Sequence, residues 1–235
     1  MKYQAEELNR FREEDAGKHW GYPYCWTEYS LPEGIGQGRG TAWVWPSFLN
    51  EFSDEECRAQ YEPAVVSMQA HSAPLGITFY DWKPEEELPS ECNGTSPFPQ
   101  DMDGHAFIAH HGSWNRDVPT GYKVVRIAFD GNGEAISGEI DFLAHEPPDA
   151  QWPDGFRPVD VTFDDCGRLI VSSDGTRGSG SKFVRIEYIG NMTMSESNKI
   201  NVQCDAYESL GSKTGHTSVF LFAVSTALLI WMLRP

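Results

Sequence analysis

Two stretches of the chain carry the same succession of apolar and polar segments. Each begins with an alternating or β-branched run, continues with a short apolar run that leads into a polar loop, and ends with a third run. The runs of the first stretch are residues 76–80, 106–109 and 125–127, and those of the second are residues 159–163, 169–171 and 184–186. A repeat of this size is typical of one supersecondary unit stacked on its copy, because neither copy can bury its apolar face alone. With at least three strand signals per unit, the pattern predicts blades of a β-propeller.

The composition agrees with a β-rich fold and narrows the range of partners. The 235 residues are 40% apolar and include 22 Gly and 15 Pro, which suits a loop-rich all-β protein better than a helical one. The formal net charge of −17 would repel the backbone of a nucleic acid, so we expect no nucleic-acid partner. Small neutral ligands are easier to accommodate.

The end of the chain is an uncharged apolar run, residues 219–233, closed by Arg234 and Pro235. As a helix this run would span roughly 22–26 Å at ~1.5 Å per residue, which is short for a plain transmembrane helix. Three interpretations stay open: a lipid-anchor attachment signal behind a polar spacer, a single membrane-spanning anchor, or a buried core segment. Both membrane interpretations place the rest of the chain at the extracellular face of the cell membrane or in a lumen.

Two acceptor triplets for N-glycosylation fit that compartment. They begin at Asn93 and at Asn191, and each has the form Asn-X-Thr. Such triplets also arise by chance, so they support the extracellular location without proving it.

Five cysteines cannot all pair with one another. Cys25 and Cys57 flank a loop-rich insert, and we expect a disulfide between them. The spacing leaves the pairing of Cys92, Cys166 and Cys204 open, and some of these could be buried free thiols.

The beginning of the chain differs from that of a secreted protein. Residues 1–11 contain no apolar core of the kind that a secretory signal peptide needs. Closed propellers need ~4 to 8 blades, whereas the strand signals account for two blades and part of a third. We therefore expect the chain to be the C-terminal part of a longer protein.

Four ordered segments resemble the glucose/sorbosone dehydrogenase family, and most of all its sorbosone and pyranose dehydrogenase branch. They are residues 71–80, 106–116, 121–127 and 156–161, and residues 7–9 with 17–25 are similar to the family segment that leads to the cofactor face. The resemblance covers about residues 5 to 190. It implies a six-bladed β-propeller that uses pyrroloquinoline quinone (PQQ) with calcium, of which this chain would form about two and a half blades.

The resemblance also implies which residues contact the cofactor. These are His111 and Arg116 in the loop after the second strand, Arg157 before a later strand, and His71. Arginine suits the three carboxylates of PQQ, because its planar fork binds a carboxylate through two hydrogen bonds. The alternatives are an Arg116 ion pair with Asp117, and histidines with purely structural roles.

Other residues are candidates for sugar stacking or metal binding. Trp114 lies inside the motif loop, and we expect it to stack on a sugar ring. Trp20, Trp26, Trp43 and Trp45 could also stack on sugars, although most propeller tryptophans pack in the core. The acidic segment 164–167 looks like a calcium loop but is typical of a hairpin turn, so the metal ligands stay unknown. In the resembling family, the general base is a histidine of an early blade, and no histidine here occupies its position, so we assign no catalytic residue.

These observations predict three parts and one function. Residues 1–190 would form the propeller blades, residues 191–217 a polar spacer, and residues 218–235 a hydrophobic tail helix. The parent protein would oxidise an aldose or sorbosone-type sugar by hydride transfer to PQQ and pass electrons to an external acceptor. The alternative is a non-catalytic cell-surface propeller that binds glycans or a protein partner.

Overall fold

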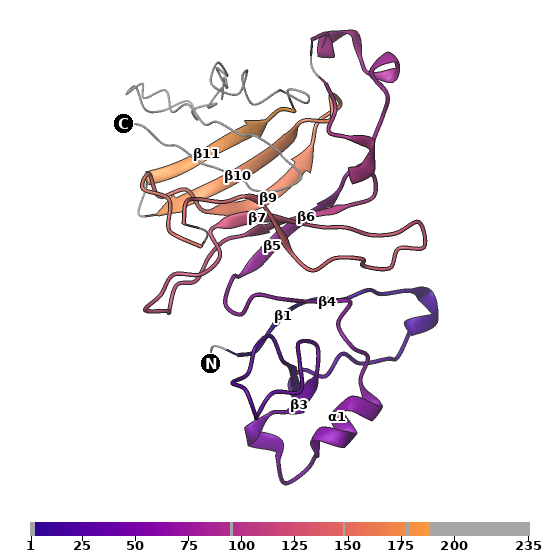
Figure 1. Ribbon diagram of the computed structural model, residues 1–235, viewed down its shortest axis with the longest axis vertical. Coiled ribbons are helices and arrows are strands. Elements are labelled where there is room, and N and C mark those ends of the chain that lie inside the picture. The colour runs from indigo at the N-terminus through magenta and orange to yellow at the C-terminus, as the bar shows by residue number, and fades with distance from the viewer. Residues whose placement is uncertain (1–2, 95, 148, 177–178, 189–235) are drawn as a thin grey trace.

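The computed structural model describes residues 3–94, 96–147, 149–176 and 179–188 of the chain. Within these residues the fold is mostly β, with one α-helix (Figure 1). The strands are β1 (Glu6–Leu8), β2 (Cys25–Thr27), β3 (Ala42–Val44), β4 (Val66–Met68), β5 (Pro74–Phe79), β6 (Ala106–His110), β7 (Lys123–Ile127), β8 (Ile140–Leu143), β9 (Pro158–Phe163), β10 (Leu169–Thr176) and β11 (Ser179–Ile186). The helix is α1 (Asp54–Gln60), and short 3-10 turns are η1 (Glu13–Asp15), η2 (Pro46–Phe48), η3 (Glu85–Glu87), η4 (Ser90–Cys92) and η5 (Gln100–Met102).

The first predicted repeat forms a four-stranded antiparallel sheet in the order β5-β6-β7-β8. Ile108 of β6 lies opposite Ile77 on one side and Val125 on the other. All five residues of β6 are buried, because other parts of the chain cover both faces of this sheet. Coverage on both faces explains why the strand reads as a continuous apolar run. The fourth strand, β8, was not among the strand signals of the sequence.

The second predicted repeat forms a three-stranded antiparallel sheet in the order β9-β10-β11. Val161, Val171 and Val184 lie opposite one another across the three strands and point into the main core. Phe183, one residue away from Val184, is on the other face and 55% exposed. The alternation of buried and exposed positions is the pattern of a sheet with one face covered.

The main core lies between these two sheets. Phe107 of β6 packs edge to face against Phe142 and against Phe163, at centroid distances of 4.9 and 5.0 Å. At Gly76 of β5 the strands approach so closely that a Cβ atom would lie 2.6 Å from the Cα atom of Asp160 in β9. The predicted stacking of one repeat on its copy is therefore confirmed.

A second, smaller core covers the opposite face of the four-stranded sheet. Val66 and Met68 of β4 pack there against Ala106, Ile108 and side chains of β7. Strand β4 pairs with β1 in a two-stranded ribbon, so residues near the N-terminus line the sheet (Figure 1).

The insert that precedes β4 folds around the predicted disulfide. Cys25 and Cys57 are bonded, with Cα atoms 5.9 Å apart, and join the β2-β3 ribbon to α1. Helix α1 begins with a capping box, in which the Ser53 side chain accepts from the Glu56 amide and the Glu56 carboxylate accepts from the Ser53 amide. The expectation of an all-β chain was wrong at this helix.

A second disulfide joins Cys92 to Cys166, a pairing that the sequence left open. It ties the segment between β5 and β6 to the turn between β9 and β10. That turn is the predicted hairpin: Asp164 accepts hydrogen bonds from the amides of Cys166 and Arg168, both at 3.0 Å. Asn93, the first predicted glycosylation site, is exposed beside the disulfide.

Several predictions fall outside the described residues. They concern the polar spacer 191–217, the tail helix 218–235, the glycosylation site Asn191 and the pairing of Cys204. Among the residues that the structure describes, no helix has the length and apolar character needed to cross a membrane.

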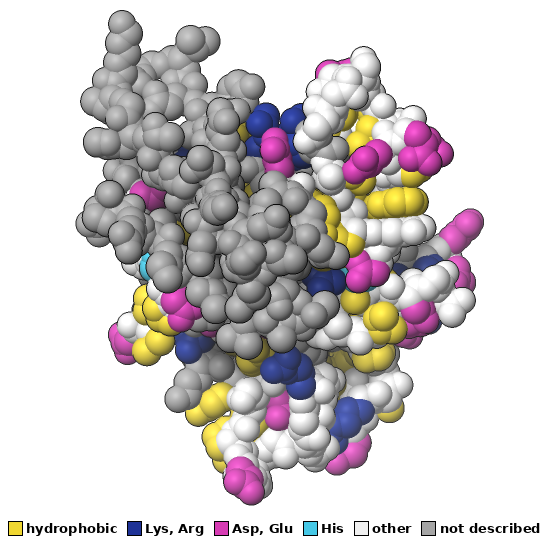
Figure 2. All heavy atoms as spheres, turned by 45° about the horizontal axis from the view of Figure 1, so that its top comes forward, with side chains coloured by type: hydrophobic (Ala, Val, Ile, Leu, Met, Phe, Trp, Pro, Cys, Tyr) yellow, Lys and Arg dark blue, Asp and Glu magenta, His cyan; other side chains and the backbone are white. Residues whose placement is uncertain are grey.

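The expected two and a half four-stranded blades are only partly found. The described strands form one four-stranded sheet, one three-stranded sheet and two two-stranded ribbons, and they do not close into a ring. On the face drawn in Figure 2, acidic and basic side chains are interspersed among apolar ones, so the negative charge is not gathered into one patch there.

Candidate functional site

The loop between β6 and β7, residues 111–121, is held by backbone hydrogen bonds to the segment before β5. The His111 amide donates to the Ala73 carbonyl at 3.0 Å, and the Gly112 amide donates to the Ser72 carbonyl at 2.9 Å. Gly112 has a φ of +94°, and a Cβ atom at this position would lie 2.5 Å from the Tyr122 ring. Only glycine fits such a close approach at positive φ, so the loop has a fixed path.

Backbone strain is concentrated around this loop. Four non-glycine residues of the described chain have positive φ values: His71, Ala73, Tyr122 and Asp149. Ala73 accepts the His111 amide, Tyr122 follows the loop, and the Asp149 carboxylate accepts from the Gly121 amide at 3.3 Å. Positive φ costs about 1–3 kcal/mol at such residues and collects at functional sites, where the surrounding structure maintains it.

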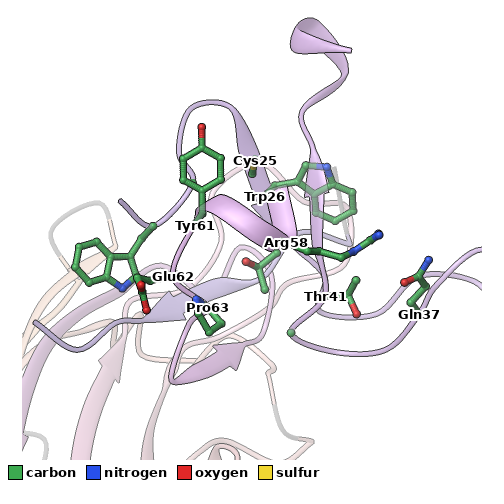
Figure 3. A pocket seen from close by; sticks show the side chains of 13 residues that line it. Cys25, Trp26, Gln37, Thr41, Arg58, Tyr61, Glu62 and Pro63 are labelled. Atoms are coloured by element: carbon green, nitrogen blue, oxygen red, sulfur yellow. The ribbon is translucent and has the colours of Figure 1, made fainter. Parts of the chain in front are cut away.

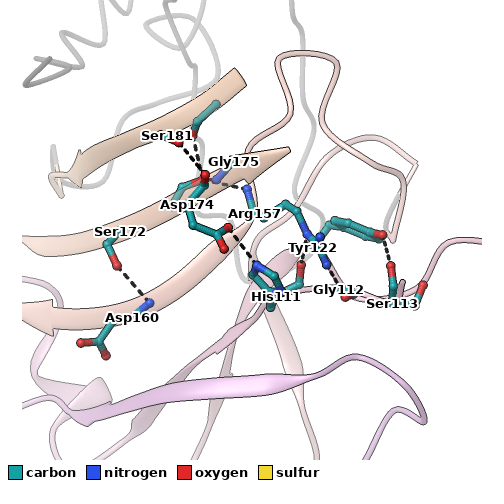
Figure 4. Close-up of polar contacts among 12 residues, drawn as sticks. His111, Gly112, Ser113, Tyr122, Arg157, Asp160, Ser172, Asp174, Gly175 and Ser181 are labelled. Atoms are coloured by element: carbon teal, nitrogen blue, oxygen red, sulfur yellow. Dashed lines mark hydrogen bonds and ion pairs between the residues drawn. The ribbon is translucent and has the colours of Figure 1, made fainter. Parts of the chain in front are cut away.

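His111 reaches from this loop to the neighbouring sheet. Its Nε2 atom lies 2.9 Å from Oδ1 of Asp174 on β10 (Figure 4). A carboxylate only accepts hydrogen bonds, so Nε2 carries the proton and the ring is oriented by Asp174. The other ring nitrogen, Nδ1, is not used in this hydrogen bond and can contact another partner. The side chain of His111 is 19% exposed, so a ligand can reach the ring.

Arg157, which precedes β9, binds the backbone of the same loop. Its Nε donates to the His111 carbonyl at 3.1 Å and its Nη2 donates to the Gly112 carbonyl at 2.8 Å. The guanidinium carbon lies 5.4 Å from the centroid of the Tyr122 ring. Arg157 therefore holds the loop in place with two of its nitrogens, which the resemblance alone did not indicate.

Arg116 and His71 lie at the other side of the loop. Arg116 Nη1 donates to the carbonyl of Ala70, directly before His71, at 3.3 Å. An ion pair between Arg116 and Asp117, the alternative from the sequence, is not found among the described residues. The His71 amide donates to the Glu6 carboxylate at 3.1 Å, which connects this segment to β1. The structure thus gathers all four predicted cofactor residues around one loop.

Trp114 stands at the tip of the loop and is 86% exposed. Its ring is accessible, so stacking on a sugar stays a prediction for this residue.

The sequence missed a buried polar cluster at the base of the loop. His110 is completely buried, and its Nδ1 atom lies 3.9 Å from Glu139 Oε2 without a hydrogen bond at either ring nitrogen. Burial, with a smaller contribution from the Lys123 charge, lowers the pKa of His110 to about 3, so this ring is neutral. Burial also raises the pKa of Glu139. His110 is buried because both faces of β6 are covered.

Lys123 supplies the positive charge of this cluster. Its Nζ atom lies 2.8 Å from Asp141 and 3.0 Å from Asp149. Burial acts to lower the pKa of Lys123, but the hydrogen bond and charge of Asp141, with the charge of Asp149, outweigh it and raise the pKa. The signal for this cluster in the sequence is a lysine directly before two valines, Val124 and Val125.

The donors around the loop fit a ligand rich in carboxylates better than they fit a metal ion. Two guanidinium and two imidazole groups come from three segments, and Arg157 Nη1 donates no hydrogen bond within the described residues. Among those residues, no group of three or more His, Cys, Asp or Glu side chains could hold a metal ion. The arrangement has the donors that an anionic planar molecule would need for binding and orientation.

Comparison with known proteins agrees with this chemistry. A pyrroloquinoline quinone-dependent sugar dehydrogenase of Hypocrea jecorina is 28% identical over 169 residues, which cover 68% of this chain and 33% of the relative. The solved structure of a Trichoderma reesei protein of carbohydrate-active enzyme family AA12 matches with a TM-score of 0.60 and 30% identity, over 78% of this chain and 44% of that one. The holo form of a pyranose dehydrogenase PQQ domain from Coprinopsis cinerea matches with a TM-score of 0.51 and 25% identity, over 69% of this chain and 39% of that one.

The chain spans about a third of the length of the curated sugar dehydrogenase that it matches. The profile of one protein family, described as TrAA12-like, matches residues 2–182. This match takes in β1 to β10, the loop of residues 111–121 and all four predicted cofactor residues. The chain therefore belongs to the TrAA12-like family, in line with the predicted resemblance to quinone-dependent sugar dehydrogenases.

Proposed function

We propose that this chain is the C-terminal part of a quinone-dependent sugar dehydrogenase and supplies one side of its PQQ site. The observation that carries the proposal is the gathering of His71, His111, Arg116 and Arg157 around one strained loop. Strain and convergent donors together indicate a ligand site rather than a structural feature. The two stacked sheets would then be successive blades of a partial six-bladed propeller.

The residues of this chain would bind and orient the cofactor. Arg116 and the free nitrogen of Arg157 would pair with carboxylates of PQQ. These ion pairs would hold the carboxylates in a fixed geometry and shield their charge from solvent. His111, oriented by Asp174, would offer Nδ1, an acceptor in the neutral ring and a donor in the protonated one. The bound quinone would supply the chemistry of accepting a hydride from an aldose or sorbosone-type sugar.

The substrate and the electron path are further parts of the proposal. Trp114 would stack on the sugar ring beside the cofactor, because its exposed face is flat and apolar. The electrons would pass to an external acceptor. Calcium would be held by groups outside the described cluster, and the sequons and the apolar tail support an extracellular, membrane-anchored location.

The test is calorimetric titration of PQQ into the 235-residue chain, with and without calcium. We expect binding that weakens about tenfold in Arg157→Lys, which keeps the charge but loses the fork. Arg168→Lys is the matched control, because Arg168 pairs with Asp164 in the β9-β10 turn, away from the loop. Absence of binding both by this chain and by the same chain extended upstream would favour the non-catalytic glycan- or protein-binding module.

A further inference from the structure

We propose that the Cys25–Cys57 region carries a second carbohydrate site, a pocket for a neutral pyranose ring that is separate from the loop of residues 111–121. The pocket has a volume of about 330 Å³, near the lower end of the ~300–1,000 Å³ typical of small-molecule sites. Its walls come from three segments, residues 20–27, 37–42 and 58–63, and it shares no lining residue with the candidate PQQ site.

Two indole rings supply apolar walls (Figure 3). Trp26 is held by stacking on Trp43 at a centroid distance of 6.3 Å and by a hydrogen bond from its Nε1 to the Val44 carbonyl at 3.1 Å. Trp20 is held by Phe11, with ring centroids 4.2 Å apart. Rings fixed in this way present flat apolar faces, which match the C–H face of a pyranose without a cost of ordering them.

Polar side chains converge on the same space. In Figure 3, Arg58 extends past Trp26 toward Gln37, while Tyr61 and Glu62 line the other end. The Gln37 side-chain carboxamide and the Tyr61 hydroxyl have no hydrogen-bond partner within the described residues, so both are available to a ligand. Planar guanidinium, carboxamide and carboxylate groups each hydrogen-bond neighbouring hydroxyls in pairs, which is how a polyol would be recognised.

The charges favour a neutral ligand over an anion. Arg58 and Glu62 line the pocket with opposite charges, and the Glu62 carboxylate is already 3.2 Å from Lys18 Nζ. A nucleotide or another polyanion would meet one arginine against a chain of net charge −17. A sugar uses both charged groups as hydrogen-bonding partners and carries no charge of its own.

The pocket is rigid because the disulfide joins its walls. Cys25 lies on β2 next to Trp26, and Cys57 lies on α1 next to Arg58, so the bond fixes an apolar wall against a polar one. The Glu62 amide donates to the His19 carbonyl at 2.9 Å and fixes the third side. A preformed pocket of this kind binds without a large loss of conformational entropy.

The experiment is a saturation-transfer difference NMR titration of the full 235-residue chain without PQQ. The probes are cellobiose and methyl β-D-glucopyranoside, with sorbitol as a control that carries hydroxyls but has no ring face. The variants are Trp20→Ala and Arg58→Ala. Trp114→Ala reports on sugar bound at the other site, and Arg168→Ala in the β9-β10 turn is the matched control outside both sites. Near-ultraviolet circular dichroism checks that each variant is folded, and Arg58 is on the exposed side of α1, where the loss of its side chain leaves the core intact.

We expect the two glucosides to bind and sorbitol to fail, with the dissociation constant raised about tenfold or more by Trp20→Ala and Arg58→Ala and unchanged by Arg168→Ala. Absence of glucoside binding to the wild-type chain would overturn the proposal. So would binding that Trp114→Ala abolishes while folded Arg58→Ala retains it, which would place the sugar at the loop instead. Because PQQ is absent, none of these outcomes depends on bound quinone, so a failure of this proposal is distinguishable from a failure of the proposed function.

Discussion

Asp174 on β10 accepts a hydrogen bond from His111 at 2.9 Å and thereby connects the loop after β6 to the neighbouring sheet. The carboxylate side chain is 60% exposed, whereas the imidazole is 19% exposed. An exposed pair of this kind contributes less than about 1 kcal/mol to stability, so its main effect is to fix the orientation of the ring.

The first prediction follows from that orientation. Asp174→Asn should weaken PQQ binding by about threefold to tenfold, because the ring loses its charged acceptor, and it should shift the free energy of unfolding by less than about 1 kcal/mol. Calorimetry and urea unfolding measure the two effects. Asp165→Asn removes the same charge from the exposed β9-β10 turn and should change neither quantity. An equal loss of affinity in both variants would point to net charge instead of ring orientation.

The second prediction concerns the two hydrogen bonds from Arg157 to the loop carbonyls. Arg157→Ala should lower the free energy of unfolding by about 3 kcal/mol or more, because each hydrogen bond from a charged donor contributes about 1.5–3 kcal/mol and the loop loses two. Hydrogen exchange should then be faster at the amides of His111 and Gly112. Unchanged exchange at these amides would show that the loop is held by its backbone bonds to residues 72–73 alone.

The third prediction is a pH dependence that originates at His110. The folded protein keeps this ring neutral down to about pH 3, whereas the unfolded chain takes up a proton below the ordinary pKa of 6.5. The unfolded state therefore binds more protons in this range, and the free energy of unfolding falls as the pH drops below 6.5, by up to about 1.4 kcal/mol per unit.

His110→Gln removes that titration, so its stability should fall less steeply between about pH 7 and pH 5 in urea unfolding. The raised pKa of Glu139 acts in the opposite direction, because that group favours the folded state more as its proton is taken up. Equal slopes in the variant and the wild type would contradict the burial of a neutral His110.

The fourth prediction concerns the Cys92–Cys166 disulfide. It closes a loop with a sequence separation of 74, so replacing both cysteines by alanine should lower the free energy of unfolding by about 2–4 kcal/mol. The Cys25–Cys57 bond closes a shorter separation of 32 and serves as the comparison. A reductant breaks both disulfides in the wild type but only Cys25–Cys57 in the double-alanine variant. Equal shifts of the urea midpoint in the two proteins would show that Cys92–Cys166 does not contribute to stability.

The fifth prediction concerns an exposed apolar stripe on β5. Leu75, Ile77 and Phe79 are 54%, 43% and 56% exposed on one face of this edge strand. Edge strands with exposed apolar side chains tend to associate, so the isolated chain should form larger species as its concentration rises. Light scattering after size-exclusion chromatography measures this, and Ile77→Lys should reduce it. A monomer at every concentration would show that these three side chains do not mediate association.

The sequence predicted a strand well where both of its faces are covered, or where buried and exposed residues alternate along it. Residues 106–110 and 169–171 show their burial directly in their apolar side chains. It did not predict α1, although Ser53 and Glu56 have the spacing of a capping box, because the surrounding loop-rich composition carried more weight.

For the candidate site, the sequence suggested which residues to consider but not the contacts among them. Motifs identified His111 and Arg157, but the bonds from Arg157 to the loop carbonyls and the role of Asp174 depend on how two sheets pack, which a single chain pattern does not contain. The Cys92–Cys166 pairing depends on the same packing. The positive φ of His71 and Tyr122 comes from tertiary contacts that maintain local strain.

His110 and His111 are consecutive residues with opposite surroundings. One ring is sealed without a hydrogen bond beneath β4, and the other faces an accessible carboxylate on β10. Because side chains alternate along a strand, a slip of β6 by one position would exchange the two imidazoles. The apolar residues that precede them therefore also decide which histidine the solvent can reach. An insertion or deletion of one residue in β6 would move the accessible ring into the interior without changing any residue of the loop.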